Sequence, residues 1–450
     1  MAASDDEGVI PLSRWRAALA RARRGRRADA IISEPDAAQL VPTLPVQELY
    51  YAIKEVGLAD AAELVALATP QQVQGFVDLD AWERDHLDEN KINAWIETLA
   101  DAGYEKLGSV VEALDAEMIA LWLQRQARII DLTIEEPPQE AEGHFYPTPD
   151  RFYLIDILPG GEEGKALERV LDWLYRYDLE LGRRIIMGAK WELGSDLEEH
   201  AWRWRQGRMA DLGYVDFYEA LSIYRWLDPA SVKIDEQTVV APPPETPTEL
   251  PAVLAGSLDE AGFFGKALST LPSDADVERL HGSLVLLINK AMAADLVDPG
   301  DFDEGKRALA RAVAYLGLGL EYLSRGDVAR AGQALGSVAL ERIFRVGLSL
   351  TLQVKTLADT LVKKGGVDPI ALEAPWDDVL RALRQRRPEY PRALDTPPAD
   401  GTRHFATLAD VARAAAALET IAKNVHTQKR ERSEERRVGK ECRSRWSPYH

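Results

Sequence analysis

The sequence is almost free of cysteine: its 450 residues include one, Cys442. A single thiol forms no internal disulfide, and it supplies no multi-cysteine zinc site. The composition therefore favours a protein of a reducing, cytoplasmic compartment.

Long apolar runs and a positive charge balance are also missing. The longest apolar stretches, 284–288 and 312–320, are far shorter than the roughly 18 to 20 residues that a membrane helix needs. The chain carries 54 Lys and Arg against 74 Asp and Glu, a formal charge of −20. Because clustered cations drive nucleic-acid binding, this balance excludes general affinity for DNA or RNA. The acidic first residues lack the features of a secretory signal, which again favours the cytoplasm.

Common catalytic signatures are absent as well. The sequence has no Gly-x-Ser-x-Gly elbow and no His-Glu-x-x-His pair. Segment 159–166 differs from a phosphate-binding loop, since Pro159 stands where a glycine is needed and Ala166 where a hydroxyl is needed. Two Glu-x-x-His pairs, 83–86 and 278–281, lie too far apart in the chain to favour a shared di-metal site. We predict no metal and no cofactor. The sequence favours a protein that is not an enzyme, but it does not exclude an enzyme.

What the sequence does have is helical periodicity. In the last third of the chain, apolar residues recur at spacings of three and four, as in Leu309, Val313, Leu316, Leu320 and Leu323. This helix is predicted to end at 324–326, and Asp327 is predicted to cap the next one. Strand signals are scarce, and 152–158 is the one convincing strand. The predicted fold class is all-α.

Two proline-rich segments, 136–149 and 233–251, are predicted to be linkers, because repeated prolines continue neither a helix nor a central strand. The predicted organisation is a basic N-terminal arm at 1–29, a helical repeat domain at 30–135, a helical domain at 150–232, a C-terminal helical domain at 252–431 and a tail at 432–450. The tail is polar and basic, with no apolar period.

The predicted repeat consists of three similar helix starts. Segments 44–49, 68–73 and 114–119 each place a helix-starting residue four positions before an apolar one, and a second apolar residue follows four positions later. Repeated helices that bury little alone stack into a solenoid. The first domain is therefore predicted to be solenoid-like, with irregular helical bundles after it; an irregular bundle of similar short helices is the alternative.

Three resemblances follow from these segments. Residues 40–130 resemble the N-terminal helical domain of the MgtE magnesium transporters, although no membrane helices follow here. Segments 199–203, 211–214, 318–327 and 343–347 resemble a bacterial domain-of-unknown-function family, 6178, which implies a helical architecture and no activity. Residues 432–450 resemble a translated vector or adaptor sequence, which implies that this tail is not native and that the native chain has no cysteine.

Segment 191–208 holds the densest polar and aromatic chemistry. On a helix, Asp196, Glu199, His200 and Arg203 share one face at spacings of three and four. An acid, an imidazole and a guanidinium together can act in general acid–base catalysis. They can also form an ion-paired network, which is the commoner outcome. These four residues are the candidate catalytic site.

The basic arm supplies candidate partner-binding residues, namely Arg14, Arg16, Arg23, Arg24, Arg26 and Arg27. Such a cluster can contact an acidic partner, an anionic membrane or nucleic acid. It can equally lie on the chain's own acidic surface or remain solvated. The predicted function is a cytoplasmic helical scaffold or adaptor that binds a protein partner. The alternative is an enzyme or a metal-dependent sensor that uses Asp196 to Arg203.

Overall fold

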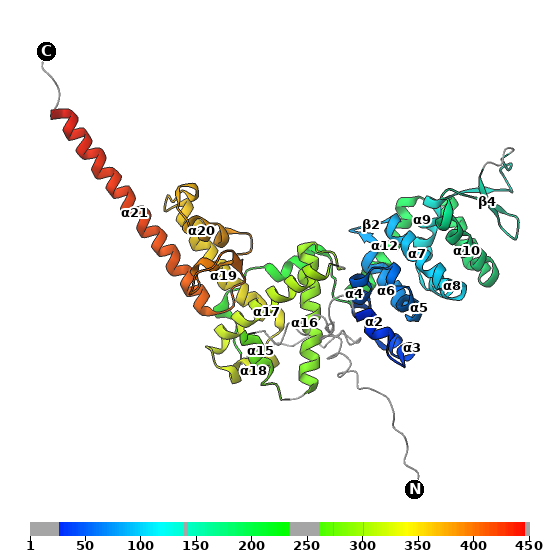
Figure 1. The fold of residues 1–450 in the computed structure, drawn as a ribbon, viewed down its shortest axis with the longest axis horizontal. Coiled ribbons are helices and arrows are strands. Elements are labelled where there is room, and N and C mark those ends of the chain that lie inside the picture. The colour runs from blue at the N-terminus through cyan, green and yellow to red at the C-terminus, as the bar shows by residue number, and fades with distance from the viewer. Residues whose placement is uncertain (1–26, 139–142, 235–261, 273, 300, 446–450) are drawn as a thin grey trace, which may run out of the picture. The chain divides into compact units, whose positions relative to one another are not determined.

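The computed structural model describes residues 27–138, 143–234, 262–272, 274–299 and 301–445, and from 428 onward it describes the backbone alone. Within these ranges the protein is mostly helical, with a few short strands (Figure 1). The predicted all-α class is confirmed. None of the described helices has both the length and the apolar character needed to cross a membrane.

The chain divides into two compact units, and each is described by itself. Among the described residues, the N-terminal unit holds 27–220 and 288–306, and the C-terminal unit holds 221–234, 262–287 and 307–445. The division falls within two long helices, α16 (Asp274–Asp295) and α17 (Phe302–Ser324). Residues on both sides of the predicted linker at 136–149 belong to the N-terminal unit, and the finer division into predicted domains stays a prediction.

Helices dominate the N-terminal unit. They are α2 (Arg27–Ile32), α3 (Ala37–Leu40), α4 (Val46–Val56), α5 (Ala62–Leu67), α6 (Pro70–Asp80), α7 (Glu89–Ala102), α8 (Tyr104–Ala113), α9 (Ala116–Gln126), α10 (Gly161–Tyr177), α11 (Leu179–Trp191), α12 (Gly194–Asp211) and α13 (Phe217–Ala220). Two short 3-10 helices, η1 (Val41–Thr43) and η2 (Ala59–Ala61), connect the first of them.

The three predicted helix starts form helices of equal length. Helices α4, α6 and α9 each have 11 residues and begin at 46, 70 and 116. At α6 a capping box fixes the start: the Gln72 amide donates to the Thr69 hydroxyl over 3.1 Å, and the Thr69 amide donates to the Gln72 side chain over 2.7 Å. Solenoid-like stacking of these helices stays a prediction.

A small antiparallel sheet lies in the N-terminal unit. Its strands are β3 (Ala127–Asp131), β4 (His144–Pro147) and β5 (Tyr153–Ile157), in the order β3–β5–β4. Strand β5 is the one predicted at 152–158. Strand β4 lies inside the predicted linker, so that segment is in part an edge strand; Pro147 is tolerated there because an edge strand can spare an N–H. A separate two-stranded pair, β1 (Trp82–Glu83) and β2 (His86–Leu87), precedes α7.

The C-terminal unit is built on long helices. It contains α15 (Gly262–Leu268), α18 (Val328–Ser337), α19 (Leu340–Lys363), α20 (Trp376–Arg384) and α21 (Leu408–Arg445), with parts of α16 and α17. The shorter elements are η3 (Leu221–Tyr224), η4 (Pro229–Ser231), η5 (Pro369–Ala371), η6 (Arg392–Leu394), β6 (Tyr390–Pro391) and β7 (Thr402–Arg403). As predicted, α17 ends at Ser324, and the Asp327 side chain accepts from the Arg330 amide over 3.0 Å to cap α18.

Helices α17 and α19 approach each other at two glycines. A Cβ on Gly319 would lie 2.2 Å from the Ile343 carbonyl oxygen, and a Cβ on Gly347 would lie 2.0 Å from that of Tyr315. Such distances are shorter than any van der Waals contact, so only glycine allows this crossing. This requirement explains why glycine occurs at 319 and 347, which lie in two of the segments, 318–327 and 343–347, that carry the family resemblance.

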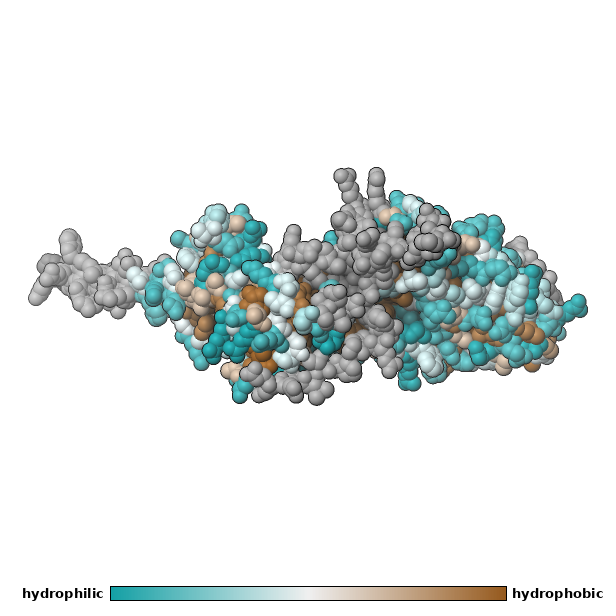
Figure 2. All heavy atoms as spheres, turned by 90° about the horizontal axis from the view of Figure 1, so that it is seen from below, coloured by the Kyte–Doolittle hydropathy of each residue, from teal (hydrophilic) through white to brown (hydrophobic). Residues whose placement is uncertain are grey.

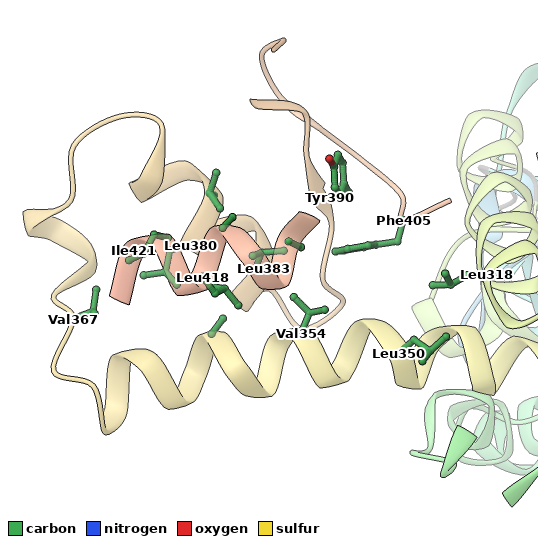
Figure 3. Close-up of a cluster of buried hydrophobic side chains, with 14 residues drawn as sticks. Leu318, Leu350, Val354, Val367, Leu380, Leu383, Tyr390, Phe405, Leu418 and Ile421 are labelled. Carbon is green, nitrogen blue, oxygen red and sulfur yellow. The ribbon is translucent and has the colours of Figure 1, made fainter. Parts of the chain in front are cut away.

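A hydrophobic cluster joins the last three helices of the C-terminal unit (Figure 3). Leu350 and Val354 come from α19, Leu380 and Leu383 from α20, and Leu418 and Ile421 from α21. Tyr390 and Phe405 add an edge-to-face ring pair with centroids 5.5 Å apart. This cluster fixes the first half of α21 to the unit. On the face drawn in Figure 2, brown hydrophobic residues appear among the teal hydrophilic surface of this unit.

Candidate functional site

The outward face of α12 carries the four predicted catalytic residues. Asp196, Glu199, His200 and Arg203 are all exposed. Glu199 forms an ion pair with Arg203, one helical turn away. Asp196 accepts from the Ser195 hydroxyl over 3.3 Å, and His200 makes no side-chain hydrogen bond to any residue that the structure describes. The spacing therefore places the four on one face, as predicted, but in solvent, and the catalytic role stays a prediction.

The inward face of α12 holds a half-buried arginine network that the sequence analysis missed. Arg208 donates to Asp78 through Nε at 2.6 Å and Nη2 at 3.0 Å. The same guanidinium donates to Asp115 through Nη1 at 3.0 Å and Nη2 at 2.6 Å. Arg205 donates from Nε to the Asp78 carbonyl oxygen over 2.7 Å. One arginine thus links α12 to the end of α6 and to the start of α9.

Burial controls the protonation of this network. It raises the pKa of Asp78, and hydrogen bonds from Arg208 offset only part of that rise. Burial also lowers the pKa of Arg205 to about 10. It would lower the pKa of Arg208 too, but the hydrogen bonds with Asp78 and Asp115 outweigh it and raise that pKa. Because Arg208 is paired with both carboxylates, the network can hold the three helices together.

A second buried polar centre lies around Asp80, at the end of α6. Its carboxylate accepts from the Tyr50 hydroxyl over 3.0 Å, from Lys54 Nζ over 2.8 Å and from Trp95 Nε1 over 3.0 Å. Burial alone would raise the pKa of Asp80, but these hydrogen bonds, led by the one from Lys54, lower it. The only feature of the sequence that could have indicated this centre is the pair of aspartates, Asp78 and Asp80, at the end of an apolar helix.

Glu198 joins α12 to the β1–β2 pair. Its carboxylate accepts from the Leu87 amide over 2.9 Å and from Arg125 Nη2 over 3.0 Å. His86 Nδ1 lies 3.4 Å from the other oxygen. His86 is thus one of several partners of a structural carboxylate. In the part of the chain that the structure describes, no group of three or more His, Cys, Asp or Glu is placed to hold a metal.

The exposed face of α11 combines apolar and basic side chains. Met187 is 52% exposed and Trp191 is 56% exposed. One helical turn separates them, and Arg183, Arg184 and Lys190 flank them. We call these five residues the α11 outer face.

Two of the three cations on the α11 outer face have acidic partners. Arg183 pairs with Asp150 at 3.1 Å, and Lys190 pairs with Glu135. Arg184 is exposed and has no ion pair with a described residue. The guanidinium of Arg183 also lies 5.7 Å from the ring of Phe152, which is 46% exposed and extends the apolar surface.

The basic arm can be assessed at one residue. Arg14, Arg16, Arg23, Arg24 and Arg26 lie outside the described residues. Arg27 begins α2, is buried and forms an ion pair with Glu55. Its guanidinium therefore contributes to the packing of α2 near α4, and it is not an exposed contact for a partner.

The described residues define a class: a mostly helical protein with a few short strands, in which Arg208 and Asp80 each centre a polar network between helices. Within that class, the chain belongs to the family of unknown function DUF6178, whose model matches residues 4–427. No curated protein and no solved structure matches the chain.

Proposed function

We propose that this protein is a cytoplasmic helical scaffold or adaptor that binds a partner protein through the α11 outer face. The observation that carries the proposal is the exposure of Met187 and Trp191 side by side on one helix face. Aromatic residues, methionine and arginine are enriched at the centres of protein interfaces. The α11 outer face combines all three.

Charge indicates which partner fits. The chain as a whole has a formal charge of −20, yet Arg184 leaves a positive charge beside the two apolar side chains. Glu180, one turn before Arg184, is the one exposed carboxylate on this side of α11. An acidic partner segment that presents an apolar side chain would bury Trp191 and compensate Arg184. The proposed partner is therefore a protein with such an acidic, apolar segment.

The test is site-specific photo-crosslinking in the native cells. The full chain carries p-benzoylphenylalanine in place of Met187, and a second version carries it in place of Ile370, which is 94% exposed and lies in the C-terminal unit. We expect a discrete adduct from position 187, with the crosslink in an acidic segment of another protein, and none from position 370. The substitution Arg184→Glu should reduce the adduct several-fold, because it repels an acidic partner.

Three outcomes would overturn the proposal. The first is equal labelling from the two positions. The second is a crosslink to a basic segment. The third is a crosslink to residues 235–261 of this same chain, which are acidic and apolar in sequence and would then be the occupant of the surface.

A further inference from the structure

Met187 differs from the other described methionines in its exposure. The chain has five methionines, and the structure describes the side chains of four of them. Met118, Met209 and Met292 are 1%, 4% and 0% exposed, whereas Met187 is 52% exposed. A dissolved oxidant therefore reaches the Met187 sulfur in the folded chain, while it reaches the other three only when the surrounding core opens.

The packing of α11 allows a polar change at Met187 without a change in the core. Ile186, Gly188 and Ala189 are on the buried side of the helix. A Cβ on Gly188 would lie 3.3 Å from the Ala120 Cβ, so α11 and α9 are in close contact there. Met187 lies on the exposed side of the same helix. A polar group added to its sulfur would therefore be solvated and would not enter the core.

We propose that Met187 is a redox-sensitive modification site, and that its oxidation to methionine sulfoxide by hydrogen peroxide releases the partner. The release rests on the proposed function above, because it requires a partner on the α11 outer face. In the reaction, the thioether sulfur forms a bond to one peroxide oxygen as the O–O bond breaks. The proton of that oxygen passes to the departing hydroxide, which leaves as water. Sulfur is oxidised by two electrons, and the peroxide is reduced.

The product changes the apolar part of the α11 outer face. Methionine is a flexible apolar side chain, whereas its sulfoxide is polar. One helical turn from Trp191, burying the new oxygen against an apolar partner side chain would cost free energy, because the oxygen would lose its hydrogen bonds with water. The charge of Arg184 stays as it is, so the oxidation weakens only the apolar contact. Methionine sulfoxide reductases, one for each epimer, restore the thioether, so the change is reversible.

The first measurement finds which methionines are oxidised. The folded full chain is treated with increasing concentrations of hydrogen peroxide, and the sulfoxide at each methionine is quantified by peptide mass spectrometry. We expect Met187 to be oxidised at least about tenfold faster than Met118, Met209 and Met292, and the four rates to become similar in denaturing urea. The urea midpoint of the chain oxidised at Met187 should equal that of the untreated chain. Equal rates at the four positions in the folded chain would overturn the proposed site.

The second measurement compares partner binding before and after oxidation. The probe is a synthetic peptide of the partner segment crosslinked at position 187, titrated against the full chain by calorimetry. We expect peroxide to weaken binding about tenfold, and subsequent treatment with the two reductases to restore it. The matched control is Met187→Leu, which has no sulfur at this position. Each chain is compared with itself before and after treatment, and we expect peroxide to leave the dissociation constant of Met187→Leu unchanged.

The possible results separate this redox role from the proposed function. If the oxidised parent chain binds the peptide as tightly as the untreated chain, or if Met187→Leu loses binding to the same extent, the redox role is overturned and the proposed function stands. If the untreated chain does not bind the peptide, the proposed function fails, and the release of a partner fails with it. In that case the oxidation rates still decide whether Met187 is the modified residue.

Discussion

On its inner face, α12 places Arg208 against the buried Asp78 and the half-buried Asp115, whereas on its outer face it leaves Glu199, His200 and Arg203 in solvent. Both faces carry charges at helical spacing, so the residue types alone do not distinguish them. What differs between the two faces is how far away in sequence the partner of each arginine lies. The Arg208 partners, Asp78 and Asp115, are 130 and 93 positions away in sequence, and the partner of Arg203 is four positions away.

This difference shows where charge stabilises the fold. Removing the guanidinium that pairs with a buried carboxylate leaves that carboxylate uncompensated, which is strongly destabilising. An exposed pair within one helix turn contributes little, because solvent screens it and the side chains lose freedom in forming it. The inner face of α12 is therefore expected to control stability and the outer face is not.

Replacing Arg208 should have the largest effect. Arg208→Ala leaves Asp78 buried without its partner, so we expect the free energy of unfolding to fall by about 3 to 5 kcal/mol. Urea titration, with hydrogen exchange in α12 as the local readout, measures this change. Arg203→Ala on the same helix is the control and should stay within about 0.5 kcal/mol. Equal effects of the two substitutions would contradict the comparison.

A second arginine network, in the C-terminal unit, is expected to stabilise the fold in a pH-dependent way. Asp410 accepts from Arg403 at 2.8 and 2.9 Å and also pairs with Arg413. Burial would raise the pKa of Asp410, but hydrogen bonds, led by those from Arg403, lower it to about 2. Since the folded pKa is below the unfolded value of 3.8, the carboxylate stabilises the fold above pH 4, and this contribution is lost as the pH falls towards 2.

The expected size of this pH-dependent contribution is about 2 kcal/mol. Asp410→Asn should remove it, so the difference in unfolding free energy between the two chains should be largest near pH 6 and shrink below pH 4. Denaturant titrations across this pH range measure the difference. Asp400→Asn is the control, because Asp400 is exposed and makes no side-chain hydrogen bond to a described residue. A difference that stays constant with pH would contradict the assigned role of Asp410.

The sequence predicted the helices better than it predicted the site. Helix starts at 46, 70 and 116 and the Asp327 cap depend on neighbouring residues, so local patterns reveal them. The Arg208 network depends on residues that meet only when three helices pack. Strand β4 was missed for the same reason, because its pairing with β5 is not encoded within 144–147 itself.

The same limit applies to the candidate site. Spacing correctly placed Asp196, Glu199, His200 and Arg203 on one helix face, but spacing does not say whether that face points to the core. The exposed residues Met187 and Trp191 look like ordinary core positions of an amphipathic helix. Their exposure could be learned only from how α11 packs on α9 and the sheet.

A smaller, stabilising effect is expected on the exposed side of α12. A Cβ added to Gly207 would meet nothing within 4 Å, so Gly207→Ala should raise the free energy of unfolding by about 0.5 to 1 kcal/mol. The urea midpoint measures the gain. Gly347→Ala, at the crossing of α17 and α19, should instead lower stability, and a gain there would contradict the close approach of these helices.

The smallest effect is expected from the outer-face ion pair. Glu199→Gln removes the pair with Arg203, and we expect a loss of about 0.3 to 0.5 kcal/mol that disappears in high salt. Thermal unfolding at two salt concentrations measures it. A loss as large as that of Arg208→Ala would mean that the outer face has a role that its exposure does not reveal.

The most direct test of the proposed function compares two exposed residues on adjacent helices, Trp191 and His200. The probe is a synthetic peptide of the partner segment crosslinked at position 187, titrated against the full chain by calorimetry. We predict that Trp191→Ala weakens binding at least about tenfold, while His200→Ala leaves the dissociation constant unchanged. Equal binding by Trp191→Ala and the parent chain, or a larger loss in His200→Ala, would contradict the proposal that the α11 outer face binds the partner.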